Sequence, residues 1–380
     1  MHKSAKLRNI FIFFLVFTIG FCTCNYIYKR YLGHFTSISL EHIVGKYNYP
    51  CKIYKSKGKY LIIDNKFNLY TFNGIDKKNL VGIKKLDLKI DINSDYFQLN
   101  NGLVVFYSID SKVSRKIQFI IFDINKEKFV KKLESKLPIN EHDYNTKIIP
   151  YEKTNFIIVS RKIGMNNQTS IQIVNATNDF IKTYYMKNYI FYDVIIPIKD
   201  KLLITQSDLS TKLQKTYLYN INENSLSKIK NLNINRTGNT RLRFVVIDEQ
   251  YLFGIEYFKG NNYIFLYDIK NLNNITELYY LKLPRNRIKE DLSQSNIAVI
   301  NNNEVLITGG EKWWLIGCGE TSKSYILNIK TKKFTRISDM NFANRNHLSI
   351  KTNGTSILLY SPYAQNNRET IQIFERGKLW

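Results

Sequence analysis

The chain has 380 residues, of which 44% are hydrophobic and 14% aromatic; this is enough apolar surface for a large core and excludes an intrinsically disordered protein. The formal net charge is +25 at pH 7. Without Lys3, Lys6 and Arg8, the rest of the chain has 53 basic and 31 acidic residues, a net charge of +22 that favours acidic partners.

Residues 10–28 are predicted to be a signal anchor or a signal peptide, preceded by a basic region at residues 1–9. The run from Ile10 to Ile27 has no charged residue, and Lys29 and Arg30 follow it. Its length is about the minimum for a membrane-spanning helix. We expect an uncleaved anchor that ties the protein to a membrane through this helix. The rest of the chain then lies outside the cytoplasm, in the periplasm or at the cell surface.

Three alternatives to the anchor stay open. A cleaved signal would make the protein secreted, although the residues around Gly20 offer no clean cleavage site. Lipidation of Cys22 is the second alternative, but Phe21 is larger than the residue that usually precedes a lipidated cysteine. A buried core helix is the third, and it lacks a partner because no other stretch has a sustained helical period.

Residues 35–380 have the pattern of one repeated β-structure with no linker inside it. Apolar strand cores recur at intervals of 42 to 54 residues, in segments rich in Ile, Val, Tyr and Phe, which favour strands. These cores begin at Leu61, Leu103, Ile157, Leu202, Leu252, Val305 and Ile357. Chance matching in a chain rich in Asn, Lys and Ile is the alternative, but seven matches in one order favour a true repeat.

Six of these cores are followed by two large apolar residues at a set spacing. The spacing is seven in Phe122/Phe129, Ile173/Phe180, Tyr219/Leu226 and Leu327/Phe334, and eight in Phe72/Leu80 and Tyr267/Ile275. An Asp or Asn follows the first member at Asn73, Asp123, Asn220, Asp268 and Asn328. Because a short polar side chain can bond the backbone nearby, each pair is predicted to flank a tight turn between two strands.

The clearest repeat lies between residues 303 and 347. An apolar strand ends in Gly309 and Gly310, where two residues that tolerate positive φ allow a sharp turn. A loop with Trp313 and Trp314 follows, and then the strand pair that contains Leu327 and Phe334.

This segment resembles a kelch repeat, which is one four-stranded blade of a β-propeller with a period of about 50 residues. The resemblance is to the kelch-repeat β-propeller family, of which the central domain of galactose oxidase is an example, through degenerate repeats of bacterial type. It implies an all-β propeller preceded by one hydrophobic helix, and it reaches no catalytic residues of the family.

The chain ends indicate how the propeller closes. The last repeat has an inner strand near Leu348–Lys351, a second strand from Ser356 to Tyr360 and a third at Thr370–Phe374, with no room for a fourth. The segment Phe35–Ser39 has the pattern of an outer strand and is predicted to pair with the third. The blade count is then seven, or six if the weak first repeat is not a full blade.

Catalytic and metal-binding patterns are mostly missing from the sequence. Only His142 and His347 lie within the repeats, in different ones, and no Cys/His cluster exists, so we expect no metal and no cofactor. The pairs Glu141/Asp143 and Glu290/Asp291 could act as acid and base, but we interpret them as solvated loop charges. A disulfide between Cys51 and Cys318 is not expected, because they fall in the first and sixth repeats.

The arginines suggest a binding face. Lysines are scattered along the sequence, whereas six of the 13 arginines fall in segments that join one repeat to the next: Arg236, Arg241, Arg243, Arg285, Arg287 and Arg345. Together with Trp313 and Trp314, we expect all of these except Arg236 to form a face for an acidic protein or an anionic glycan. Bracing between blades is the alternative role of the arginines, and packing beneath the loop is that of the tryptophans.

Two classes of function remain. The first is a membrane-tethered module, without enzymatic activity, that binds a protein or a glycan. The second is an exported carbohydrate-active enzyme, because some bacterial kelch propellers act on sialic acids, for example as isomerases. Nucleic acid fits the charge, but an exported location argues against it. Fold alone does not decide between the two classes.

Overall fold

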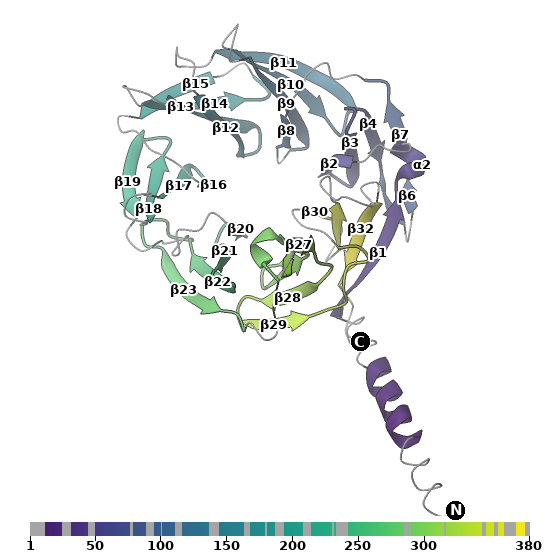
Figure 1. Ribbon diagram of the computed structural model, residues 1–380. Helices are drawn as coiled ribbons and strands as arrows, with labels where there is room; N and C mark the ends of the chain where they lie inside the picture. The colour runs from purple at the N-terminus through teal and green to yellow at the C-terminus, as the bar shows by residue number, and fades with distance from the viewer. Residues whose placement is uncertain are drawn as a thin grey trace, which may run out of the picture. The chain divides into compact units, whose positions relative to one another are not determined.

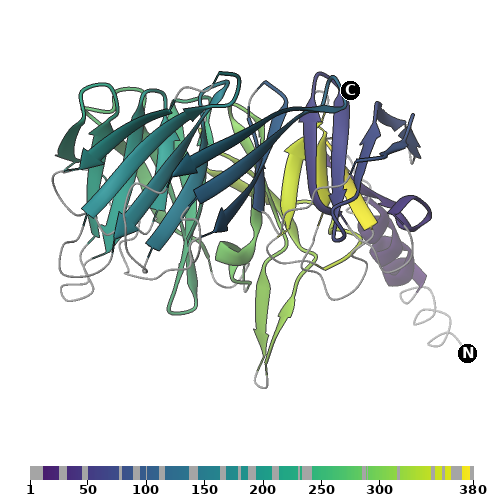
Figure 2. The ribbon, with the colours of Figure 1, turned by 90° about the horizontal axis from the view of Figure 1, so that it is seen from above.

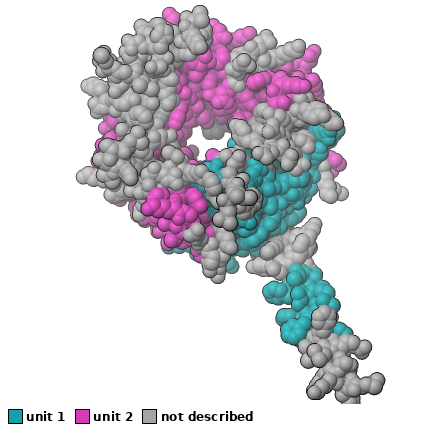
Figure 3. Space-filling model, viewed as in Figure 1, with its two compact units in different colours: residues 1–47, 289–380 teal, residues 48–288 magenta. Residues whose placement is uncertain are grey.

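A computed structural model describes most of the chain and all of its repeats. The described residues are 12–24, 32–44, 50–76, 79–88, 95–99, 101–110, 116–136, 144–162, 168–178, 181–186, 194–207, 214–229, 232, 242–284, 288, 290–314, 317–343, 347–352, 356–360 and 370–376. They contain seven four-stranded antiparallel sheets, which are the blades of an all-β propeller (Figure 1). The chain divides into two compact units, residues 48–288 and residues 1–47 with 289–380 (Figure 3).

The unit of residues 48–288 contains five blades. The first blade has β2 (Pro50–Ser56), β3 (Lys59–Asp64), β4 (Leu69–Phe72) and β7 (Lys84–Leu86), and the second has β8 (Asp95–Gln98), β9 (Leu103–Asp110), β10 (Lys116–Asp123) and β11 (Lys128–Lys136). The third has β12 (Tyr144–Tyr151), β13 (Asn155–Lys162), β14 (Gln168–Asn175) and β15 (Ile181–Met186). The fourth has β16 (Val194–Ile198), β17 (Lys201–Ser207), β18 (Gln214–Asn220) and β19 (Ser225–Ile229), and the fifth has β20 (Leu242–Ile247), β21 (Tyr251–Phe258), β22 (Asn261–Asp268) and β23 (Thr276–Lys282).

The other unit, residues 1–47 with 289–380, contains two blades. The sixth blade has β24 (Asn296–Asn301), β25 (Glu304–Thr308), β28 (Ser324–Asn328) and β29 (Lys333–Arg336). The seventh has β30 (Leu348–Lys351), β31 (Ile357–Tyr360), β32 (Thr370–Glu375) and β1 (His34–Ser39). A short helix, α2 (Glu41–Val44), and a 3₁₀ turn, η1 (Leu292–Gln294), also belong to this unit.

The predicted strand cores and the predicted closure are confirmed. All seven cores lie in the second strands of their blades: β3, β9, β13, β17, β21, β25 and β31. The N-terminal strand β1 pairs with β32 in the expected antiparallel arrangement, with Phe35 opposite Phe374. The number of blades is therefore seven, and the weak first repeat is a full blade.

The predicted tight turn between the third and fourth strands is confirmed in the second, fourth, fifth and sixth blades; after Asn73 of the first blade an inserted hairpin stands in its place. Asp123 Oδ1 accepts hydrogen bonds from the backbone N–H groups of Asn125 and Lys126, at 2.9 and 3.2 Å. Equivalent contacts form at Asn220, Asp268 and Asn328. The residue after each of these side chains is an isoleucine that donates its N–H to the turn between the second and first strands of its blade. One polar side chain thus orders the turn after the third strand, and a backbone hydrogen bond joins this turn to the turn between the first and second strands.

The register of the third blade differs from the prediction. Val174 pairs with Ile181, seven positions apart, and Asn175 forms the turn contacts with the N–H groups of Thr177 and Asn178. The predicted pair Ile173/Phe180 was therefore wrong by one residue; Phe180 itself lies outside the described residues. A one-residue shift moves a side chain to the opposite face of a strand, so only the Val174 register places the turn asparagine correctly.

The first blade contains an insertion that the sequence analysis missed. Residues after Phe72 form a separate hairpin, β5 (Gly74–Asp76) and β6 (Asn79–Val81), in which Leu80 pairs with Ile75. The predicted pair Phe72/Leu80 was wrong, because the true fourth strand is β7, which begins at Lys84. In the fifth blade, a bulge places Glu277 opposite Tyr267, and the predicted partner Ile275 is buried just before β23.

Apolar side chains fill the spaces between neighbouring blades of each unit. In the two-blade unit, Leu306 and Ile326 of the sixth blade pack with Phe35, Ile357 and Phe374 of the seventh. In the five-blade unit, Phe119 and Leu133 of the second blade pack with Phe156 of the third. Each of these blades therefore buries a face against its neighbour, which explains why the repeats occur as a set.

Residues 12–24 form a helix, drawn in purple near the N-terminus in Figure 1. Its large apolar side chains are between 49% and 68% exposed. Among the described residues, no helix has both the length and the hydropathy needed to cross a bilayer. Residues 10, 11 and 25–28 of the predicted anchor lie outside the described part of the chain.

Candidate functional site

The predicted glycine pair forms a close backbone crossing in the sixth blade. Gly309 and Gly310 have φ angles of +69° and +124°, which disfavour other residues. A Cβ atom on Gly310 would lie 2.8 Å from the carbonyl oxygen of Asp291 and 2.9 Å from Ser295 Oγ. Glycine at position 310 therefore lets the segment that precedes η1 approach the end of β25.

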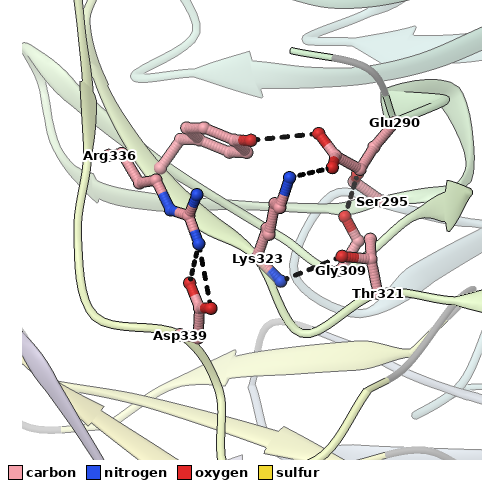
Figure 4. Close-up of polar contacts among 8 residues, drawn as sticks. Glu290, Ser295, Gly309, Thr321, Lys323, Arg336 and Asp339 are labelled. Atoms are coloured by element: carbon pink, nitrogen blue, oxygen red, sulfur yellow. Dashed lines mark hydrogen bonds and ion pairs between the residues drawn. The ribbon is translucent and has the colours of Figure 1, made fainter. Parts of the chain in front are cut away.

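The segment before η1 is bonded to the chain that follows the glycines. The backbone groups of Asp291 and Glu311 exchange hydrogen bonds of 2.7 and 3.2 Å. Ser295 Oγ donates to the carbonyl of Gly309 at 2.8 Å, as Figure 4 shows. The Asp291 carboxylate caps η1 by accepting from Ser293 N at 2.9 Å. These contacts hold the start of the next hairpin on the blade.

A hairpin extends from the sixth blade directly after the glycine pair and is drawn in light green in Figure 2. Its strands are β26 (Glu311–Trp314) and β27 (Gly317–Glu320), with Trp313 opposite Cys318 and Trp314 opposite Gly317. The sequence predicted a loop here, and the structure has a paired ribbon. The ribbon lies between the second and third strands of the blade, as expected, so both tryptophan positions lie outside the four-stranded sheet.

Glu290 forms a buried polar cluster beside the glycine pair (Figure 4). Its side chain is fully buried, forms an ion pair with Lys323 and accepts a hydrogen bond from the Tyr325 hydroxyl at 3.2 Å. Burial alone raises the pKa of Glu290, but the hydrogen bonds and the positive charge of Lys323 outweigh it and hold the pKa below its ordinary value. Glu290 is therefore ionised at neutral pH.

The interpretation of Glu290 and Asp291 as solvated loop charges was wrong. Both residues have no exposed surface. Their carboxylates accept the hydrogen bonds described above, so both stabilise this corner of the blade. The other pair, Glu141/Asp143, lies outside the described residues. No sequence signal identified Lys323 and Tyr325 as partners of Glu290, since the contact forms only when β28 packs beside this segment.

Of the five predicted arginines, the structure describes one. Arg243 lies in β20 of the fifth blade with an exposed side chain, although neighbouring protein atoms desolvate its guanidinium and lower its pKa. An arginine keeps its charge at neutral pH despite such a shift. Arg241, Arg285, Arg287 and Arg345 lie outside the described residues, as does Arg236.

Arg336, which the sequence analysis did not select, donates to both carboxylate oxygens of Asp339 at 2.9 and 3.0 Å (Figure 4). His347 is buried and lies 2.7 Å from Thr308 Oγ1 through its Nε2 atom. No group of three or more His, Cys, Asp or Glu side chains among the described residues could hold a metal ion.

Comparison with known proteins assigns the chain to no family. No protein-family model matches it, and no curated protein matches it. One similar solved structure is the β-propeller domain of the Trilobed protease from Pyrococcus furiosus, described as having an open velcro topology. The two are 12% identical, with a TM-score of 0.41, over 63% of this chain and 71% of that one.

Proposed function

We propose that this β-propeller is an exported interaction module of kelch type, tethered to a membrane by residues 10–28, that binds an acidic protein or an anionic glycan. The binding face would contain Trp313 and Trp314 with the arginines at 241, 243, 285, 287 and 345. The proposal assigns no cofactor and no catalytic residue.

The observation that carries this proposal is the hairpin β26–β27. It places two adjacent tryptophan positions beyond the four-stranded sheet of the sixth blade, on a ribbon that the glycine crossing fixes at its base. Tryptophan and arginine are the residues most enriched where protein interfaces gain their binding energy. The exposed side chain of Arg243 adds a positive charge that suits a carboxylate or phosphate.

The kelch assignment has support from the sixth blade. Its second strand ends in the glycine pair at positive φ, and Leu327 and Phe334 lie opposite each other in the following strand pair. The membrane tether has support from the helix at residues 12–24, because a helix that is apolar on all sides requires either a protein core or a lipid environment.

A binding experiment with two acidic probes tests the function. Replacing Arg285 and Arg287 with Ala should leave the melting temperature unchanged and weaken binding to poly-aspartate or hyaluronan at least about fivefold, more strongly at low salt because screening is weaker there. The matched control replaces Lys330 and Lys333, which are exposed, and removes the same charge. If the arginine variant melts earlier and binds normally, the arginines brace blades and this face is not the binding site.

The alternative function is that of an exported carbohydrate-active enzyme, such as an isomerase of sialic acids. The enzyme predicts conversion of a sialic acid anomer by the purified protein, which nuclear magnetic resonance detects directly. The binding module predicts no such conversion and retained affinity for an acidic polymer.

A further inference from the structure

The fourth strand of the third blade, β15, has an open outer edge. It is the last strand of its sheet, and in the described part of the chain no strand pairs with it beyond β14 (Figure 1). Its register with β14 is unbroken from Ile181 to Met186. Alternate residues of an edge strand direct their N–H and C=O groups outward, so β15 presents a row of backbone groups to solvent. Such a row is a template for another strand.

The other outer strands have features that oppose such pairing. β11 and β23 each contain a bulge, at Val130 and Leu278, that interrupts the row. β7 and β29 have only three and four residues, and β19 exposes only polar side chains. In β1, the side chain of Asn341 donates to the Phe35 carbonyl and to the Ser37 hydroxyl. β15 is six residues long, has no bulge and contains a single lysine.

β15 also exposes large apolar side chains. Ile181 and Tyr185 are 37% and 48% exposed, and their face of the strand turns toward the second blade, because Ile181 pairs with Val174 of the core that the second and third blades share. Lys182 and Tyr184 lie on the opposite face, with the lysine ammonium 4.7 Å from the centroid of the tyrosine ring. An unbroken edge with exposed apolar side chains is the kind that associates with a further strand.

The sequence of β15 is complementary to itself. When Thr183 lies opposite Thr183 of a second copy in an antiparallel pair, Ile181 lies opposite Tyr185 and Lys182 lies opposite Tyr184. The two-fold symmetry repeats each of these pairs. Aromatic and β-branched side chains, two threonines, and a cation with an aromatic ring all form favourable contacts across strands. No two like charges oppose each other in this register.

Charge near the strand supports the same arrangement. Tyr184 packs in the same core cluster as Tyr151. Burial, and then the negative charges of Glu152 and Asp200, raise the pKa of the Tyr151 hydroxyl. A second copy brings its Lys182 to this side of the strand, where carboxylates are present. The net charge of +25 still repels the two molecules as a whole, so association should strengthen as salt increases.

We propose that two copies of this chain associate through β15, by antiparallel pairing of the two strands about a two-fold axis at Thr183. The contact covers residues 181–185 of each copy. This is a small interface, so the dimer should be weak in solution. The site lies on the third blade and does not depend on the proposed tryptophan and arginine face.

Sedimentation equilibrium of the full-length protein in detergent tests the proposal at several protein and salt concentrations. The wild type should shift from monomer to dimer as its concentration rises. The variant Ile181→Lys, Tyr185→Lys should dimerise at least about tenfold more weakly, because lysines then oppose each other in two pairs. A strictly monomeric wild type would overturn the proposal. Unchanged dimerisation of the lysine variant would also overturn it and assign the association to another contact, such as the N-terminal helix.

The matched control is Val130→Lys, Leu278→Lys. It adds the same charge at positions that are 40% and 45% exposed, on the two outer strands with bulges. It should change the dimer Kd by less than about twofold, because charges far from the contact are screened. Equal weakening in both double variants would mean that net charge alone controls association, and the proposal would be wrong. If the β15 double variant does not fold, Tyr185→Lys alone decides: at least about threefold weaker dimerisation supports the pairing, and unchanged dimerisation overturns it.

Disulfide cross-linking tests the register. In a background with the four natural cysteines replaced by serine, Thr183→Cys should form a linked dimer on mild oxidation, because residues directly opposite each other have Cβ atoms about 5 Å apart. Ile181→Cys alone should not, because its two copies would lie about 13 Å apart at the rise of a strand. A mixture of Ile181→Cys and Tyr185→Cys should cross-link. Equal cross-linking of the two single variants would indicate random collision and overturn the register.

Discussion

Phe35 and Phe374 lie opposite each other in the antiparallel pair β1–β32, with their ring centroids 5.3 Å apart. They come from opposite ends of the chain. Both side chains belong to the core between the sixth and seventh blades, where Phe374 has no exposed surface and Phe35 is 9% exposed. The N-terminal strand therefore supplies both backbone hydrogen bonds and core volume to the last blade.

Removal of this contact should destabilise the fold. Phe374→Ala should lower the free energy of unfolding by about 3–5 kcal/mol, because it leaves a cavity in a fully buried site. Phe35→Ala should cost somewhat less, and deletion of residues 33–42 should unfold the protein because it exposes an unpaired strand edge. Thermal or urea unfolding measures all three, with Thr36→Ala as the control. An unchanged melting temperature for the deletion would contradict the closure.

Gly310→Ala should destabilise the sixth blade more than the same change at Gly58 destabilises the first. Both glycines have positive φ, but the new Cβ at position 310 meets backbone at 2.8 Å, whereas nothing lies within 4 Å at position 58. The Gly58 variant should lose about 1 kcal/mol from the backbone conformation alone. The Gly310 variant should lose about 1–3 kcal/mol more, since the crossing must open. Equal melting temperatures for the two variants would show that the backbone at Asp291 moves away from position 310 at little energetic cost.

Glu290→Gln should destabilise the protein at neutral pH by about 3 kcal/mol, because it leaves the ammonium group of Lys323 without its anion. The pKa of Glu290 is lowered in the folded state, so its stabilising contribution is present above the ordinary carboxyl pKa and is lost as the pH falls through the folded value. The difference in melting temperature between wild type and variant should therefore shrink below about pH 4. Thermal melts from pH 7 to about pH 3 measure this.

A control for this cluster is the double variant Glu290→Gln, Lys323→Met, which removes both charges. It should be more stable than Glu290→Gln alone, because no ion is then left without a partner. The single variant Lys323→Met completes the comparison. If the double variant loses as much stability as Glu290→Gln and Lys323→Met lose together, the two groups do not interact in solution.

Residues 1–35, fused to a reporter that is active only outside the cytoplasm, should give a signal. The physical reason is the uncharged run from Ile10 to Ile27 behind a basic segment. The same fusion with Val16→Lys and Phe17→Lys should give no signal, because two charges in the middle of the run oppose insertion into a bilayer. Intact protein recovered from the soluble cytoplasm would contradict the tether, and a shortened soluble form would favour a cleaved signal.

Much of the fold could be predicted from local pattern. The second strand of every blade is a continuous apolar run, because it is buried on both faces, and this made all seven cores visible. The turn after the third strand was visible for a different reason: one Asp or Asn side chain satisfies backbone N–H groups, so the signal lies in a single residue. The likeness of Phe35–Ser39 to another outer strand predicted the closing pair.

Predictions failed where a pattern had two interpretations. Ile173 and Val174 are both apolar, and only the turn contacts of Asn175 show which one precedes the turn asparagine. Leu80 fits an outer strand as well as Lys84–Leu86 does, and the inserted hairpin decided between them. For the candidate site, the glycine pair and the tryptophan position between strands were predicted, whereas the buried state of Glu290 was not.

Local residue patterns were enough to predict the repeat, the number of strand cores and the pairing of the chain ends, because each depends on residues close together in the chain or on a recurring pattern. Tertiary structure alone decided the surroundings of individual side chains. Glu290 became a buried partner of the partly exposed Lys323 only once the segment before η1 packed beside β28. Charge and burial at these positions depend on which strands become neighbours, and no local pattern of residues contains that information.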